Sequence, residues 1–153
     1  MSVDLAKIEI DNGTLPAPTA EIEHERRVAI FDLVEGNVFR PEGGEGGPYT
    51  LRLSSQDNRL VFEISGPNFE RTHALSLTPL KTVIRDYGLI CESYYEALKG
   101  SSPSQIESVD MGRRGLHNEG AELLQNRLEG KIELDKETSR RLFTLVCALY
   151  RRG

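Results

Sequence analysis

The chain has 153 residues, of which 38% are hydrophobic and 28% are charged. This length and composition are typical of one folded globular domain and exclude a disordered or fibrous chain. No apolar run approaches the roughly 18 residues of a membrane-spanning helix, and the formal net charge of −5 disfavours binding to nucleic acid or to an anionic membrane. We therefore expect a single domain over residues 1–153 that binds no nucleic acid and no membrane.

The N-terminus and the cysteines indicate an ordinary cytoplasmic setting. The first residues, MSVDLAKIEIDNG, contain no basic segment followed by an apolar stretch, so no signal peptide is predicted. Cys91 and Cys147 lie in apolar helical patterns and are expected to be reduced core thiols. Neither has the C-x-x-C or C-x-H spacing of a zinc site. We expect a cytoplasmic protein without a metal or other cofactor.

The N-terminal third predicts one strand, one helix and one loop. The segment LAKIEI (5–10) alternates apolar and polar residues, which is typical of a short strand. Apolar residues then recur at helical spacing up to Glu35, and Thr19 is placed to be the N-cap of this helix. The glycine-rich segment FRPEGGEGGP (39–48) predicts a mobile loop. It is not a phosphate-binding loop, because it lacks the Gly-Lys-Ser/Thr ending.

The middle of the chain predicts three short strands. They cover approximately residues 49–54, 60–64 and 72–77, and SQDNR and GPNFE connect them. Short connections of this kind favour an antiparallel meander with one buried face. The segment KIEL (131–134) predicts one more short strand. The pattern leaves open which edge of the meander the strands at 5–10 and 131–134 would join.

The rest of the chain predicts three further helices. Thr78 is placed as N-cap of a helix that ends at Gly100, and Ser102 and Gln105 form a capping box at the start of the next. Asp135 is placed to cap the last helix. The expected fold is therefore a single α+β domain, in which a small, mostly antiparallel sheet packs with about four helices.

One stretch of the predicted helix after Ser102 is unusual, DMGRRGLHNEG (110–120). On a helical wheel, Arg113 and Gly120 fall inside an apolar arc of roughly 140°. The apolar members of this arc are Ile106, Val109, Leu116, Leu123, Leu124 and Leu128. A basic side chain facing an apolar interior is costly unless a partner meets it. Each glycine costs about 1 kcal/mol in a helix interior, and close approach of another backbone would explain them.

The same stretch supplies the candidate site. Its ligand-binding candidates are Asp110, Arg113, Arg114, His117 and Glu119. The basic excess of the last third supports this choice, since residues 101–153 hold 9 basic and 8 acidic side chains, against 10 and 16 in residues 1–100. Two structural interpretations stay open beside it. Arg113 could pair with an acid such as Asp110, and its loss would cost about 3–5 kcal/mol if that pair is buried; or the helix could break at Gly112 or Gly115.

Two functions fit these residues. The first is a non-catalytic interaction module that recognises a small anion or an acidic protein partner through the Arg113 region. The alternative is a small metabolic enzyme acting on a phosphorylated or carboxylated substrate, with His117 or Glu119 as the acid–base group. A pocket joining Arg113 and His117 to a second carboxylate would favour the enzyme. A flat, apolar, self-complementary surface would instead indicate a homo-oligomer.

Two long segments resemble a known family. They are SLTPLKTVIRDYGLICESYYEAL and SPSQIESVDMGRRGLHNEGAELLQNRLEGKIELDKETSRRLFTLVCALYRRG, and EHERRVAIFDLVEGNVFRP fits as well. Over roughly residues 20–153 the chain is similar to a UPF-class family of short uncharacterised alphaproteobacterial proteins. The resemblance implies a bacterial cytosolic protein, and it carries over no activity, cofactor or site residue.

Overall fold

The computed structural model describes residues 4–151 and contains four helices and six strands within them. The helices are α1 Ala20–Glu35, α2 Thr78–Gly100, α3 Pro103–Leu128 and α4 Lys136–Tyr150. The strands are β1 Leu5–Ile10, β2 Phe39–Pro41, β3 Tyr49–Gln56, β4 Arg59–Gly66, β5 Phe69–Ser76 and β6 Ile132–Leu134. The expected α+β class, with a mostly antiparallel sheet and four helices, is confirmed.

The meander forms most of a four-stranded sheet with the order β1-β3-β4-β5. Strands β3, β4 and β5 are antiparallel neighbours, with Leu53 opposite Phe62 and Val61 opposite Ala74. Strand β1 joins the β3 edge in the parallel direction, which answers the question that its sequence left open. Parallel pairing requires a long crossover, and here the crossover contains α1.

The short strand β6 pairs outside the meander, with β2. The expectation of a mobile loop over residues 39–48 is therefore wrong for residues 39–41, which form β2. Phe39 is only 1% exposed and lies opposite Leu134 in an antiparallel ladder. Burial of these two side chains fixes both segments, although each is too short to form a strand alone.

Three of the four predicted helix caps are confirmed. The side chains of Thr19, Ser102 and Asp135 each accept a hydrogen bond from a backbone N–H of the first turn. The prediction for Thr78 is wrong, because Thr78 is already the first helical residue and Leu77 is the N-cap. Buried Leu77 donates a backbone hydrogen bond to the carbonyl oxygen of Asn58, and it is the one residue between the end of β5 and the start of the helix.

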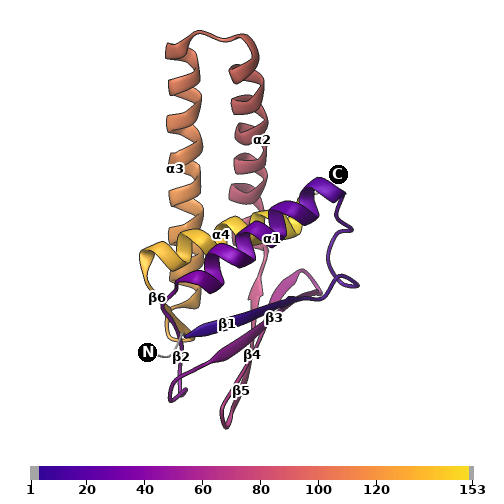
Figure 1. Cartoon of the computed structure of the whole chain (residues 1–153), viewed down its shortest axis with the longest axis vertical. Coiled ribbons are helices and arrows are strands. Elements are labelled where there is room, and N and C mark those ends of the chain that lie inside the picture. Colours follow the sequence, from indigo (N-terminus) through magenta and orange to yellow (C-terminus); the bar gives the residue numbers. More distant parts are fainter. Residues whose placement is uncertain (1–3, 152–153) are drawn as a thin grey trace.

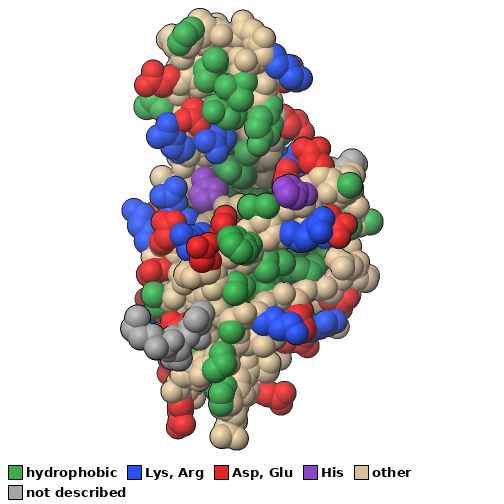
Figure 2. Space-filling model, viewed as in Figure 1, with side chains coloured by type: hydrophobic (Ala, Val, Ile, Leu, Met, Phe, Trp, Pro, Cys, Tyr) green, Lys and Arg blue, Asp and Glu red, His purple; other side chains and the backbone are tan. Residues whose placement is uncertain are grey.

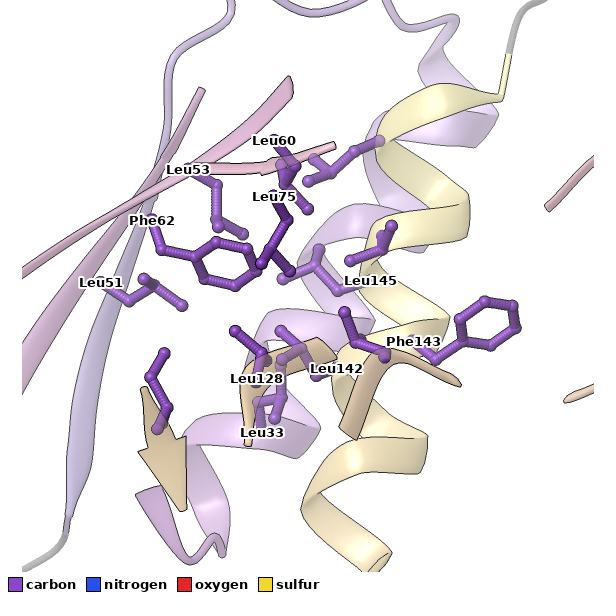
Figure 3. Packing of buried hydrophobic residues seen from close by; sticks show 14 of the residues in the cluster. Leu33, Leu51, Leu53, Leu60, Phe62, Leu75, Leu128, Leu142, Phe143 and Leu145 are labelled. Carbon is purple, nitrogen blue, oxygen red and sulfur yellow. The ribbon is translucent and has the colours of Figure 1, made fainter. Parts of the chain in front are cut away.

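Helices α1 and α4 lie beside one another over one face of the sheet (Figure 1). Alternate side chains of the meander point toward them, and α4 supplies Leu142 and Leu145 to the same cluster (Figure 3). The side chain of Phe143 points to the other side of α4, away from the sheet (Figure 3). Helix α4 is therefore buried on two sides, and its apolar residues belong to two different packing layers.

A buried arginine joins α1 to the end of α4. Arg26 is 4% exposed and donates to the carbonyl oxygens of Ala148 at 3.2 Å, Leu149 at 3.0 Å and Pro16 at 2.9 Å. The last carbonyls of a helix lack partners within the helix and carry partial negative charge. Arg26 satisfies them without a carboxylate, and burial lowers the pKa of its guanidinium.

Helices α2 and α3 form an antiparallel hairpin that projects away from the sheet (Figure 1). Its foot packs on α4 at Gly120, where an added Cβ would collide with the ring of Phe143. A Cβ at Gly112 would meet only the Ile90 side chain, at 2.8 Å, and one at Gly115 would meet nothing within 4 Å. Of the three unusual glycines, Gly120 is thus the one that a close helix crossing requires.

Substitution of two glycines of α3 tests this assignment. Gly120→Ala should lower the free energy of unfolding by about 1–3 kcal/mol, because the methyl group overpacks the contact with Phe143. Gly115→Ala is the matched control and should raise the free energy of unfolding by about 1 kcal/mol, since it removes a flexible residue from an open helix position. Chemical denaturation measures both. Equal effects of the two substitutions would contradict the crossing.

Candidate functional site

Asp110 binds two arginines at once on the outer part of α3. Its Oδ1 accepts from Nε of Arg113 at 3.1 Å and from Nη2 at 2.6 Å. Its Oδ2 accepts from Nε of Arg114 at 2.9 Å and also from Nη2. The spacings of three and four residues place all three side chains on neighbouring helix positions. Each guanidinium approaches one carboxylate oxygen with two donors.

The arginine pair is half-buried on one side and open on the other. The guanidinium of Arg113 lies over the ring of Tyr94, with Cζ 4.8 Å from the ring centroid. The side chain of Asp110 is 15% exposed, that of Arg113 30% and that of Arg114 64%. The hydrogen bonds from both guanidiniums lower the pKa of Asp110, and the same bond to Asp110 raises the pKa of Arg113.

This geometry decides between two of the interpretations left open by the sequence. Helix α3 is continuous through Gly112 and Gly115, so it does not break there. Arg113 pairs with Asp110, as the structural interpretation expected, but the pair is not fully buried. One carboxylate facing two guanidiniums leaves a net charge of +1. Among the bonds of residues 4–151, none uses Nη1 of Arg114, which leaves donors free for a second acid.

His117 lies one turn further along α3 and belongs to a different contact. Its Nε2 is 2.7 Å from the hydroxyl oxygen of Thr144. That hydroxyl donates to the carbonyl oxygen of Arg140 at 3.1 Å, which assigns the histidine proton to Nε2. The ring lies between Tyr87 and Phe143, with both centroid distances 5.3 Å. Burial, then the charges of Arg140 and Arg113, lower its pKa, so His117 is neutral near pH 7.

The five candidate residues do not converge on one pocket. Glu119 is exposed and forms no ion pair within the described part of the chain. An open cleft of about 940 Å³ lies between β2, β6 and the facing ends of α3 and α4, and a groove of about 790 Å³ runs along the hairpin. None of the candidates lines either hollow. Only Asp110, Arg113 and Arg114 form a cluster.

Three residues of these contacts were missing from the sequence prediction. Tyr94 supports Arg113, and Thr144 and Tyr87 surround His117. Tyr87 and Tyr94 are seven positions apart on the apolar face of α2, so their position beside α3 could have been predicted from the sequence. No local signal connects His117 to Thr144, 27 residues later.

The rest of the described chain adds no metal cluster and no membrane span. Within residues 4–151, no group of three His, Cys, Asp or Glu side chains could hold a metal ion. No helix in the same range is both long and apolar enough to span a membrane. Cys91 and Cys147 are free, and burial raises the pKa of both thiols.

The partial exposure of Arg113 predicts a modest stability effect. Arg113→Ala should lower the free energy of unfolding by about 1 kcal/mol, the size of a cation–π contact at a partly exposed position. A cost of about 3–5 kcal/mol would require a buried ion pair. Urea denaturation of wild type and Arg113→Ala measures the difference. A loss above about 3 kcal/mol would show that the pair is more deeply buried than this geometry allows.

The lowered pKa of His117 predicts a dependence of stability on pH. Below pH about 6.5 the unfolded chain takes up a proton that folded His117 does not, so the free energy of unfolding should fall as pH drops toward the folded pKa. Above that pH the contribution should be constant. His117→Gln should make the slope shallower. His73, whose pKa is also lowered by burial and Arg71, serves as comparison. In His73→Gln, the part of the pH dependence that comes from His117 should remain.

Comparison with known proteins places the chain in a bacterial family. A family model described as "Uncharacterised protein family (UPF0262)" matches residues 2–152. A UPF0262 protein of Phenylobacterium zucineum is 58% identical over 149 residues, and one of Caulobacter vibrioides is 57% identical over 149; each match covers 97% of this chain and 94% of the relative. No solved structure matches it. As its resemblance predicted, the chain belongs to the UPF0262 family of alphaproteobacterial proteins.

Proposed function

We propose that this protein is a non-catalytic interaction module that recognises an acidic protein partner through Arg113 and Arg114 of α3. The proposal rests mainly on the sharing of Asp110 by two guanidiniums. This arrangement orients both arginines and leaves one positive charge uncompensated. Arginine presents a planar set of donors that matches a carboxylate in two parallel hydrogen bonds. The open side of Arg114 can therefore receive a glutamate or aspartate of a partner.

The surroundings favour a protein segment over a small anion. The cluster lies on the side of a projecting hairpin, and neither hollow of the surface includes it. Small-molecule sites are concave and enclose most of their ligand. Figure 2 shows hydrophobic side chains along the outer part of the hairpin and basic side chains below them. An apolar surface beside a basic cluster fits a partner that presents both apolar and acidic side chains.

The enzyme alternative finds less support. Its proposed acid–base groups were His117 and Glu119, but His117 is held between two aromatic rings and Glu119 is exposed without a partner in the described residues. One observation still favours it. Nδ1 of His117 is buried and has no hydrogen-bond partner within residues 4–151. A buried neutral nitrogen could accept a proton, yet His117 lines neither hollow.

A labelled acidic peptide tests the proposal. A fluorescein-labelled oligoglutamate should bind wild-type protein at low ionic strength, and its affinity should fall as salt is added. Arg114→Ala should weaken binding about two- to fivefold, as expected for an exposed charge pair. Arg114→Lys should restore only part of the loss, because an ammonium group cannot make the two parallel bonds. Fluorescence anisotropy measures these affinities.

The matched control is Arg85→Ala on α2. Arg85 is 69% exposed and pairs only with its neighbour Asp86 among the described residues, so its removal takes away the same charge at another place on the hairpin. If Arg85→Ala and Arg114→Ala bind the peptide equally weakly, the loss of affinity comes from the change in net charge alone, which would contradict the proposal. Inorganic phosphate that competes at the same concentration as the peptide would show a small-anion site instead.

A further inference from the structure

The larger of the two hollows is separate from the cluster of Asp110, Arg113 and Arg114, which we call the Asp110 cluster. This cleft of about 940 Å³ lies between β2, β6 and the facing ends of α3 and α4, and its volume is within the roughly 300–1,000 Å³ of small-molecule sites. Most of its lining side chains are charged or carry an amide group, so the cleft selects a polar ligand. Three apolar lining residues are at most 6% exposed, namely Ala121, Ile132 and Leu134.

Arg140 lines this cleft and differs from the other sheltered arginines of the chain. Six arginines of residues 4–151 are buried or half-buried. Five of them donate to a carboxylate or to a carbonyl oxygen, namely Arg26, Arg52, Arg113, Arg141 and Arg151. Half-buried Arg140 uses only its backbone carbonyl, which accepts from Thr144, and its guanidinium has no hydrogen bond or ion pair within the described residues. A charge partly withdrawn from water without a partner is costly, so an anion in the cleft would stabilise it.

Two lysines of the cleft also lack an acidic partner. Lys131 is the half-buried lysine of the described residues, and its carbonyl oxygen accepts a backbone hydrogen bond of 2.9 Å from the residue that follows β2. Lys136 lies four positions before Arg140 on α4, which makes the two side chains neighbours on the helix surface. Neither ammonium group forms an ion pair within residues 4–151, whereas Arg40 of the same lining pairs with Glu133. Three cations of the described lining are thus left for a ligand.

Two acids and an amide line the cleft from the side of α3. Glu122 is exposed on the helix, and Glu129 follows its last residue. Gln125 lies three positions after Glu122, and its Nε2 donates to the carbonyl oxygen of Leu134 at 2.8 Å, which leaves Oε1 as an acceptor. The lining as a whole holds four basic and four acidic side chains. Within residues 4–151, no ion pair joins the acids of α3 to the three cations.

Unpaired charges of both signs in one cleft fit a ligand that carries both signs itself. A polyanion such as phosphate would satisfy the cations but would meet repulsion from the glutamates, because the lining carries no net charge. A carboxylate matches the parallel donors of a guanidinium such as that of Arg140. An ammonium group matches the carboxylate of Glu122 and Oε1 of Gln125, which are neighbours on one helix face.

We infer that this cleft binds a small zwitterion of the amino-acid class, with its carboxylate at Arg140 and its ammonium group at Glu122. Lys131 and Lys136 add positive charge on the carboxylate side. The inference goes beyond the proposed function, because the cleft shares no residue with the Asp110 cluster.

Thermal unfolding of the full chain tests the class of ligand. Each of the twenty standard amino acids is added at millimolar concentration, and at least one should raise the melting temperature, because a ligand that binds only the folded state stabilises it. The carboxamide form of that amino acid, which lacks the carboxylate, should bind at least about tenfold more weakly. Its N-acetyl form, which lacks the ammonium group, should bind about two- to fivefold more weakly. Isothermal titration calorimetry measures these affinities.

Three results of this experiment overturn the inference. The first is that no amino acid raises the melting temperature. The second is that inorganic phosphate, the comparison probe, raises it more than every amino acid does, which would show a simple anion site. The third is an N-acetyl form that binds as tightly as the free amino acid, since the ammonium group would then have no contact.

Matched substitutions test where the zwitterion binds. Arg140→Gln should weaken binding at least about tenfold. Arg127→Gln is the control, because Arg127 is exposed on α3 and does not line the cleft. Glu122→Gln should weaken binding about two- to fivefold, and Glu119→Gln, also exposed on α3 outside the cleft, is its control. Melting temperatures without ligand verify that the variants fold. Equal losses of affinity in a variant and its control overturn the assignment.

The cleft and the Asp110 cluster are tested separately. Arg114→Ala should bind the amino acid as tightly as wild type, and Arg140→Gln should bind the oligoglutamate as tightly as Arg85→Ala does. An amino-acid affinity that falls in Arg114→Ala and not in Arg140→Gln would place the zwitterion at the Asp110 cluster and overturn its assignment to the cleft.

Discussion

The placement of the hairpin depends on one close contact, in which α3 passes over α4 at Gly120. The ring of Phe143 fills the space that a side chain at Gly120 would need. Because the two helices approach so closely there, Leu124 and Leu128 of α3 reach the main core, and His117 reaches Thr144. The hairpin is attached at this foot, and its outer part extends beyond the layer that α4 provides (Figure 1).

The parts of the fold that local chemistry determines could be predicted from the sequence. Strands β3, β4 and β5 follow from alternation and short turns, and three helix starts follow from side chains that cap them. The remaining parts depend on residues far apart in the chain. Strand β2 exists because Phe39 is buried opposite Leu134, and β1 pairs in parallel across α1. No turn or cap in the sequence signals either pairing.

The candidate site divides in the same way. Asp110, Arg113 and Arg114 could be grouped from the sequence because helix geometry alone brings residues three and four apart together. His117 shared that helix, but α4 determines its contacts through Thr144 and Phe143. The glycines also needed the tertiary structure to be told apart, since Gly115 faces open space and Gly120 faces a ring. Spacing therefore identified the charged cluster but could not separate it from its neighbours.

Two arginines on apolar helix faces show two ways in which this fold accommodates a positive charge. Arg26 is enclosed, and it donates to three carbonyl oxygens at the end of α4 and before α1, so its charge serves the fold. Arg113 lies beyond the core, depends on an acid of its own helix, and shares that acid with Arg114. The first arrangement uses acceptors of the same chain. The second leaves positive charge and apolar surface together on the same projecting element, and a partner with complementary groups would satisfy both at once.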